Sequence, residues 1–164
     1  MNNEQFKLQK VWQSLNKDLA EEITTFWMNN KALPSQKATM SRAGQVAYVA
    51  RSSSGQIIAV TTAYPQYNEQ LNNHFYYIRA FVADTSRRSH LGVELLRKVR
   101  SLFESLYREG VISPAIGLFM EVENPLLKQA RNEAVWPTTG FVYIGDNAKG
   151  DHQRVYYFDG ARIN

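Results

Sequence analysis

The sequence predicts a mixed fold of helices and strands, α+β or α/β, with three layers around one mixed sheet. Segments whose apolar residues recur every three or four positions alternate with short segments rich in β-branched and aromatic residues. The predicted order is a helix, an antiparallel strand pair, and then strand, helix, strand, helix and two closing strands. The 164 residues suit a single domain, 1–164, because this is close to the usual size for one core.

The first half of the chain predicts one helix and three strands. A helix from about Glu4 to Asn30 follows from apolar residues spaced by three and four. Strands are predicted at Val46–Ala50 and Gln56–Ala63, joined by a Ser-Ser-Ser-Gly turn. A loop is expected at Tyr64–Asn73. The aromatic and β-branched segment His74–Ala83 then predicts a central strand covered on both faces.

The second half begins with a long helix, which starts near His90 or Leu91. Its apolar face is formed by leucines, a valine and a phenylalanine, and we expect its charged residues to lie on a solvated face. The apolar set is Leu95, Leu96, Val99, Leu102, Phe103 and Leu106, and the charged set is Arg97, Lys98, Arg100 and Glu104.

A strand, a second helix and two closing strands are predicted after that helix. In the strand Gly117–Val122, alternation places Glu121 and Glu123 on one face. Asn124 and Pro125 start a helix that ends before Pro137. Closing strands follow at Gly140–Ile144 and Arg154–Phe158.

Composition excludes several kinds of site. With no cysteine, the chain has no disulfide, cysteine-ligated zinc, iron–sulfur cluster or catalytic thiol. His74, His90 and His152 are far apart in sequence, so no metal site is expected. A domain of this size without disulfides fits the reducing cytosol, and we expect a cytoplasmic protein.

Charge and hydropathy limit the partners. No apolar run approaches the roughly 18 residues of a membrane span, and the first residues do not resemble a signal peptide, so no membrane partner is expected. The net charge of +4 favours anionic partners, phosphates among them, but it is too small to establish nucleic-acid binding.

The segment from Phe81 to Val93 carries the chemical information. It runs from the end of a buried strand, through a polar turn with two arginines, into the start of a long helix. A helix N-terminus presents unpaired N–H groups and a positive dipole end, which attract phosphate. Guanidinium groups add donors in a fork that suits phosphate oxygens. The segment is neither a Walker loop nor a dinucleotide fingerprint, because it lacks the required GK[ST] ending and glycine spacing.

This segment resembles the pyrophosphate loop of the GNAT superfamily of acyl-CoA-dependent N-acetyltransferases, Arg/Gln-x-x-Gly-x-Gly/Ala. Val82 takes the strand position, Arg87 the opening position and Gly92 the last glycine. The order of elements, with Thr139-Gly140-Phe141 near the end, also matches the family from about residue 4 to 160. The resemblance implies an α+β fold, a three-layer α/β/α arrangement with a mixed, mostly antiparallel central sheet.

The resemblance also implies a function: transfer of an acetyl group from acetyl-CoA to a primary amine by direct attack, without an acyl-enzyme. The coenzyme A would contact the strand end and the loop. The strand end would pair with the pantetheine amides and supply an oxyanion contact near Val82 or Ala83. The loop would bind the diphosphate. The implied coenzyme residues are Phe81, Val82, Ala83, Arg87, Arg88, Ser89, His90, Leu91, Gly92 and Val93.

Two positions differ from the family pattern. His90 stands where the family usually has its first glycine, and its imidazole either points to solvent or donates to a phosphate. Trp136 stands where many members carry the tyrosine that protonates the leaving thiolate, and indole cannot serve as that acid. Tyr143 is the nearest substitute acid, or an ordinary strand aromatic. Glu123, near the end of its strand, is the expected base, or a solvated glutamate.

Three classes of function follow from these residues. The first is the N-acetyltransferase, with a small-molecule or peptide amine as its acceptor. The second is a non-catalytic domain that keeps the fold and binds coenzyme A or a partner. The third, ranked last, is a basic nucleic-acid or ribosome-associated module. Tyr64, Tyr67, Tyr76 and Tyr77 line an aromatic cleft or belong to the core, and pairing into a homodimer through an edge strand is left open.

Overall fold

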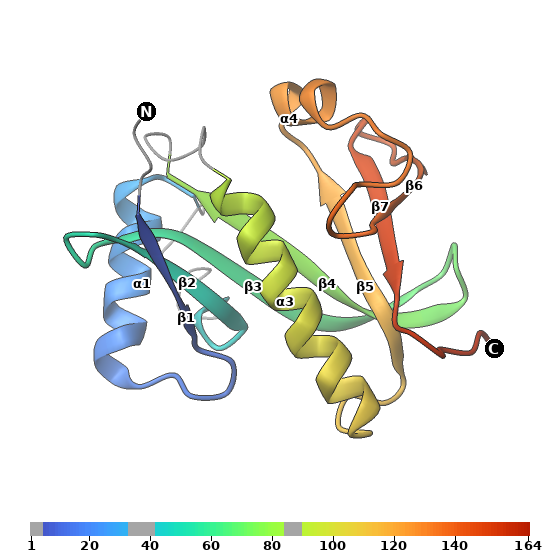
Figure 1. The fold of residues 1–164 in the computed structure, drawn as a ribbon, viewed down its shortest axis with the longest axis horizontal. Coiled ribbons are helices and arrows are strands. Elements are labelled where there is room, and N and C mark those ends of the chain that lie inside the picture. The colour runs from blue at the N-terminus through green and yellow to red at the C-terminus, as the bar shows by residue number, and fades with distance from the viewer. Residues whose placement is uncertain (1–4, 33–41, 84–89) are drawn as a thin grey trace. The chain divides into compact units, whose positions relative to one another are not determined.

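The computed structural model describes residues 5–32, 42–83 and 90–164 and confirms an α+β fold. Its mixed sheet has seven strands in the order β1-β2-β3-β4-β5-β7-β6. The β4–β5 pair is parallel, while β1–β2, β2–β3, β5–β7 and β6–β7 are antiparallel. The elements, drawn in Figure 1, are β1 Phe6–Lys10, α1 Lys17–Asn29, β2 Val46–Ser52, β3 Ile57–Asn68, β4 Asn73–Val82, α3 Leu91–Arg108, β5 Ala115–Val122, α4 Pro125–Ala130, β6 Val142–Asp146 and β7 His152–Tyr157.

The chain divides into two compact units. Unit 1 contains Met1–Ala63 and Ala80–Val99, and unit 2 contains Tyr64–Arg79 and Arg100–Asn164. Strands β3 and β4 and helix α3 contribute residues to both units. Within the described ranges, each helix is too short or too polar to cross a membrane. The single domain inferred from chain length stays a prediction.

Unit 1 begins with a strand where a helix was predicted. Phe6–Lys10 pairs antiparallel with β2 (Figure 1), and Phe6 and Leu8 pack beside the cluster around Leu91 and Leu95. Of the segment predicted as a helix, only the part from Lys17 onward is helical in the structure. Asn16 caps that helix by accepting from the Leu19 N–H at 2.8 Å, which fixes its start well after Glu4.

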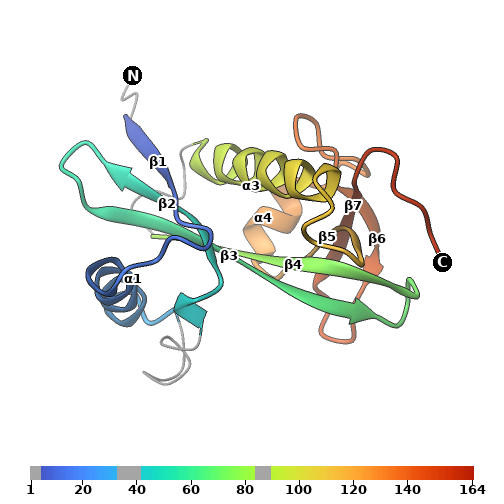
Figure 2. The ribbon, with the colours of Figure 1, turned by 90° about the horizontal axis from the view of Figure 1, so that it is seen from below.

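The two faces of β2 and β3 are covered by different helices. On one face, Ile23, Phe26 and Trp27 of α1 pack into a cluster with Val49 and Val60. On the other face, Leu91 and Leu95 at the start of α3 pack with Ala50 and Ala59. Figure 2 shows α1 and the start of α3 on opposite sides of these strands. Unit 1 therefore has the three layers that the sequence predicted.

Strand β3 is longer than predicted, because most of the expected Tyr64–Asn73 loop is strand. β3 continues to Asn68, and β4 starts again at Asn73. Aromatic pairs across this hairpin explain the extension: Tyr64 lies 5.5 Å from Tyr77, and Tyr67 lies 5.1 Å from His74, between ring centres. Pro65, a residue usually read as a loop signal, is exposed within the strand.

Unit 2 is centred on β5. Phe75, Ile116, Phe119 and Val155 form one buried hydrophobic cluster of this unit. Gly117 is required here because a Cβ at this position would lie 2.3 Å from the carbonyl oxygen of Tyr156 on β7. The helix that starts at Pro125 ends at Ala130, before Pro137 as predicted.

The charged face predicted for α3 is only partly solvated. Arg97 and Lys98 are exposed, as expected. Arg100 instead donates to the carbonyl oxygens of Thr138 and Thr139, at 3.1 and 2.8 Å. Glu104 accepts from the Tyr156 hydroxyl at 2.8 Å and from the Asp159 N–H at 2.9 Å. The half of α3 that belongs to unit 2 therefore makes polar contacts with the rest of that unit, and helical periodicity does not reveal them.

Candidate functional site

The end of β4 supplies the first candidate residues. Phe81, Val82 and Ala83 are all half-buried. Phe81 packs edge-on against Phe26, with ring centres 5.8 Å apart, and Val82 packs beside the cluster of Leu91 and Leu95. The Ala83 N–H donates to the carbonyl oxygen of Ile58 at 2.9 Å. An oxyanion contact from Ala83 would therefore have to replace this bond.

The start of α3 supplies the next candidates. Arg87, Arg88 and Ser89 lie outside the described residues. His90 is exposed, and its carbonyl oxygen accepts from the Glu94 N–H at 3.1 Å, in the manner of a helix-capping residue. Glu94, four residues after His90, forms an ion pair with Arg97, with 2.9 Å between Oε1 of Glu94 and Nη1 of Arg97.

Leu91, Gly92 and Val93 form the first turn of α3. Leu91 is fully buried, Val93 is half-buried and Gly92 is exposed. Among the described residues, no heavy atom lies within 4 Å of the position that a Cβ on Gly92 would take. The helix runs for 18 residues, and its dipole places partial positive charge at this turn.

Glu121 and Glu123 lie at the end of β5, as predicted, and both are exposed. Glu123 directly precedes Asn124, whose Oδ1 accepts from the Leu126 N–H at 2.9 Å and caps α4. Glu121 has a partner in the β6–β7 loop, since one of its carboxylate oxygens accepts a short hydrogen bond from Nδ2 of Asn147. The same amide nitrogen donates to Asp151 at 3.0 Å.

Tyr143 lies on β6 with its side chain exposed. Its hydroxyl donates to Oδ1 of Asp146 at 2.8 Å. This hydrogen bond, with a smaller contribution from the negative charge of Asp146, raises the pKa of Tyr143. Nε2 of His152 lies 3.8 Å from the same carboxylate oxygen. The hydroxyl hydrogen of Tyr143 is therefore directed at the Asp146 side chain.

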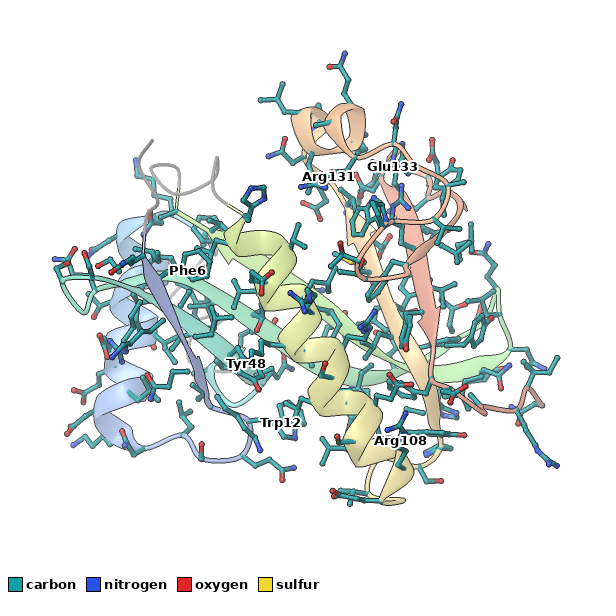
Figure 3. All side chains as sticks on the ribbon, viewed as in Figure 1. Phe6, Trp12, Tyr48, Arg108, Arg131 and Glu133 are labelled. Atoms are coloured by element: carbon teal, nitrogen blue, oxygen red, sulfur yellow. The ribbon has the colours of Figure 1, made fainter. Side chains whose placement is uncertain are left out.

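Trp136 has a structural role. Its side chain is buried, and its Nε1 donates to the carbonyl oxygen of Arg131 at 2.9 Å. The guanidinium of Arg154 covers the ring at 4.2 Å from its centre. Arg131 and Glu133, labelled in Figure 3, lie in the segment between α4 and β6 that this tryptophan anchors.

The sequence interpretation missed Arg154 and Asn68. Arg154, predicted only as the start of a strand, is 1% exposed. The sequence signal that could have identified Arg154 is its position, because it is a charged residue next to the β-branched and aromatic residues of β7. Asn68 is also buried, where a loop was predicted, and it donates to the Tyr77 hydroxyl at 2.8 Å. In the described ranges, no three His, Cys, Asp or Glu side chains lie close enough together to hold a metal ion.

No family model matches the sequence, and no curated protein sequence matches it. Solved structures are similar to it in fold along nearly the whole chain. An acetyltransferase of the GNAT family from Streptococcus pneumoniae has a TM-score of 0.65 at 12% identity, covering 94% of this chain and 99% of that one. A mosquito arylalkylamine N-acetyltransferase like 5b has a TM-score of 0.66 at 13% identity, covering 94% and 100%.

A third similar structure includes a coenzyme. It is a GNAT family acetyltransferase from Brucella melitensis in complex with acetyl-CoA, with a TM-score of 0.57 at 14% identity, covering 99% of this chain and 94% of that one. This chain therefore has the GNAT fold, which confirms the resemblance drawn from its sequence.

Proposed function

We propose that this protein is an acyl-CoA-dependent N-acetyltransferase that moves the acetyl group of acetyl-CoA to a primary amine by direct attack. The observation that carries the proposal is the GNAT fold, shared over at least 94% of the chain with structures that include an acetyl-CoA complex. The absence of cysteine agrees with this chemistry, because direct transfer requires no protein thiol.

The first turn of α3 fits a coenzyme phosphate. It combines an exposed glycine, Gly92, with backbone N–H groups and a positive helix end. In the proposal Phe81, Val82 and Ala83 hold the pantetheine, and the diphosphate contacts Arg87, Arg88, Ser89, His90, Leu91, Gly92 and Val93. Leu91 contributes only its backbone, since its side chain is buried. The coenzyme supplies the activated thioester.

Two side chains of unit 2 are proposed to handle protons. Glu123 is the base that takes a proton from the acceptor ammonium, and its exposure leaves it accessible. Tyr143 is the acid that gives a proton to the departing thiolate. Its raised pKa means that the phenol carries its proton at neutral pH, and the hydroxyl would have to turn away from Asp146 to give that proton to the thiolate.

A non-catalytic coenzyme A-binding or interaction domain is the second candidate. The observation that favours it is Trp136, which occupies the position of the family's usual acid and is bound into the packing by Arg131 and Arg154. Such a domain would keep coenzyme affinity without transferring the acetyl group.

Thermal melting with acetyl-CoA tests coenzyme binding. At about 100 times its dissociation constant a ligand stabilises the native state by about 2.7 kcal/mol, which raises the melting temperature measurably. Absence of a shift at saturating acetyl-CoA would exclude both coenzyme-dependent functions. Arg87→Ala is expected to reduce the shift, whereas Arg97→Ala, on the exposed face of α3, is expected to leave it unchanged.

Measuring release of the free thiol of coenzyme A distinguishes an acetyltransferase from a non-catalytic binding domain. The protein is mixed with acetyl-CoA and a panel of amines that includes amino acids, polyamines, aminoglycosides and peptide N-termini. Release that depends on the amine supports the transferase. A melting shift without amine-dependent release supports the binding domain.

A further inference from the structure

Asn68 holds the side chain of Tyr77 in one orientation. Asn68 ends β3 and is 7% exposed. Its Oδ1 accepts from the Leu71 N–H at 2.8 Å, so the amide nitrogen must face the other way. That nitrogen donates to the Tyr77 hydroxyl oxygen at 2.8 Å. The hydrogen of the Tyr77 hydroxyl is therefore directed elsewhere, and no described residue accepts it.

Arg79 lies two residues further along β4, on the same face of the strand as Tyr77. Its guanidinium lies over the ring of Tyr64, 5.1 Å from the centre, and one Nη donates to the Tyr64 hydroxyl at 3.1 Å. Arg79 is exposed, and its remaining N–H groups have no acceptor among the described residues. Tyr64 thus supports a cation whose outer donors face solvent.

Glu121 lies on the same face of the neighbouring strand. The parallel register pairs Tyr77 with Phe119, whose rings stack at 4.7 Å, and Glu121 follows two residues later on β5. Tyr77 and Phe119 are the last pair of this register, and Arg79 and Glu121 each lie two residues beyond it on their own strand. Glu121 uses one oxygen to accept from Asn147, while the other has no partner within the part of the chain that the structure describes.

Arg79 and Glu121 therefore carry opposite charges on neighbouring strands, each two residues beyond the last pair of the register, and no ion pair joins them in the described structure. Each is engaged by a different neighbour, Tyr64 for Arg79 and Asn147 for Glu121. Arg79 and Tyr77 on β4 offer hydrogen-bond donors, and Glu121 on β5 offers a carboxylate. Together these groups complement a molecule that carries both a carboxylate and an ammonium group. Burial raises the pKa of Tyr77, and the charge of Glu121 adds to this, so the phenol stays a donor.

We propose that Tyr77, Arg79 and Glu121 recognise a free α-amino acid as the acceptor, with Arg79 and Tyr77 binding its carboxylate and Glu121 binding its ammonium group. This assignment rests on the proposed acetyltransferase function and specifies its substrate class. Guanidinium and phenol donors suit a carboxylate, and a carboxylate suits an ammonium, because charge-assisted hydrogen bonds are the strong ones. A simple amine would satisfy only Glu121.

The test compares each amino acid with its decarboxylated amine, for example phenylalanine with phenethylamine. The wild-type protein should favour the amino acid in kcat/KM by about tenfold, as expected for loss of a charge-assisted bond at an exposed site. Arg79→Gln should remove this preference while leaving activity toward the simple amine. Tyr77→Phe should reduce the preference about threefold or more, the usual effect of one hydrogen bond.

Glu121→Gln should raise KM for both members of each pair, because both carry the ammonium. Matched controls come from unit 2. Arg108→Gln removes another exposed arginine, and Tyr67→Phe removes a hydroxyl from the same hairpin that already donates to Asn72. Both controls should keep the wild-type preference. Melting temperatures of all variants establish that they fold.

Failure of the inference can be told apart from failure of the proposed function. The inference would be overturned if simple amines were acetylated as efficiently as the amino acids or more so, or if Arg79→Gln kept the wild-type preference. Either result would still be consistent with the proposed acetyltransferase function. If no acceptor is acetylated, calorimetric binding of the same pairs decides. Tighter binding of the amino acid that Arg79→Gln abolishes supports the recognition site, and equal binding overturns it.

Discussion

The guanidinium of Arg154 lies 4.2 Å from the ring centre of Trp136 and is almost completely enclosed. It donates to the carbonyl oxygens of Arg131 and Phe141, at 3.1 and 3.4 Å. Burial lowers the pKa of Arg154, and the charge of Glu133 opposes that effect. One side chain on β7 therefore fastens both ends of the segment that joins α4 to β6.

Arg154→Ala should reduce the free energy of unfolding by about 2–4 kcal/mol, because it opens a cavity beside Trp136 and leaves two carbonyl oxygens without this donor. Urea denaturation measures the change. Arg97→Ala, which removes an exposed arginine paired with Glu94, should cost less than about 0.5 kcal/mol. Equal costs for the two variants would show that Arg154 does not fasten this segment.

Asp146→Asn should lower the pKa of Tyr143 toward its ordinary value. The hydrogen bond to the carboxylate, followed by a small desolvation effect and the charge of Asp146, favours the protonated phenol, so removing that charge should ease ionisation. Because the folded pKa is raised, the associated stabilisation is present below the ordinary tyrosine pKa and declines as pH rises above it.

Carbon-labelled tyrosine NMR follows this titration, with Tyr143→Phe identifying the resonance. Asp159→Asn is the control, because Asp159 affects Tyr156 and not Tyr143. A Tyr143 titration that is the same in the wild type and in Asp146→Asn would mean that the hydrogen bond is not formed in solution.

Glu22→Gln should destabilise the protein at neutral pH and have little effect in acid. Glu22 on α1 and Arg51 on β2 form a two-point ion pair, at 2.6 and 2.7 Å, and Arg51 also donates to Gln9 of β1 at 2.9 Å. The hydrogen bond from Arg51 lowers the pKa of Glu22. A lowered carboxyl pKa stabilises above the unfolded pKa, and this stabilisation is lost as pH falls through the folded value.

The expected cost of Glu22→Gln is only about 0.5–1 kcal/mol, since the pair is partly exposed and screened by solvent. Unfolding measured at neutral and acidic pH, in low and high salt, gives the comparison. A cost that does not shrink with added salt or acid would contradict an electrostatic origin.

Gly117→Ala and Gly92→Ala should have opposite effects on stability. A methyl group on Gly117 meets the Tyr156 carbonyl oxygen at 2.3 Å, so β5 and β7 must shift, at a cost of about 1–3 kcal/mol. A methyl group on Gly92, in a helical turn, meets no atom of the described residues within 4 Å, and it should stabilise the fold by about 0.5 kcal/mol. Thermal melting of both variants checks the two signs.

Gly92→Ala also bears on the coenzyme. In the proposed site the same methyl group lies at the first turn of α3, where the diphosphate would bind, and we expect weaker acetyl-CoA binding despite the more stable fold. Unchanged acetyl-CoA affinity in Gly92→Ala would remove this turn from the proposed phosphate contacts.

Local patterns predicted the elements whose neighbours lie close in sequence. The strand at β4 and the apolar face of α3 followed from residue type and periodicity, as did the helix start at Asn124, whose side chain caps α4. The order of these elements, with Arg87 and Gly92 between strand and helix, was enough to indicate the GNAT fold.

The features that the sequence did not predict depend on contacts between segments that lie far apart in the chain. Phe6 and Leu8 have no helical or strand preference strong enough to identify β1, which forms because β2 offers an edge to pair with. Arg154 is buried because carbonyl oxygens 13 and 23 positions away surround its guanidinium. Asn68 orients Tyr77 only after β3 and β4 have come together.

Trp136 also gives a spectroscopic handle on folding. Of the three tryptophans, Trp12 and Trp27 belong to unit 1, and Trp136 belongs to unit 2. Replacing Trp12 and Trp27 by phenylalanine leaves an indole whose emission reports unit 2, while Trp136→Phe leaves emission from unit 1. Denaturation curves of these two proteins coincide if the units unfold as one cooperative block and separate if they do not.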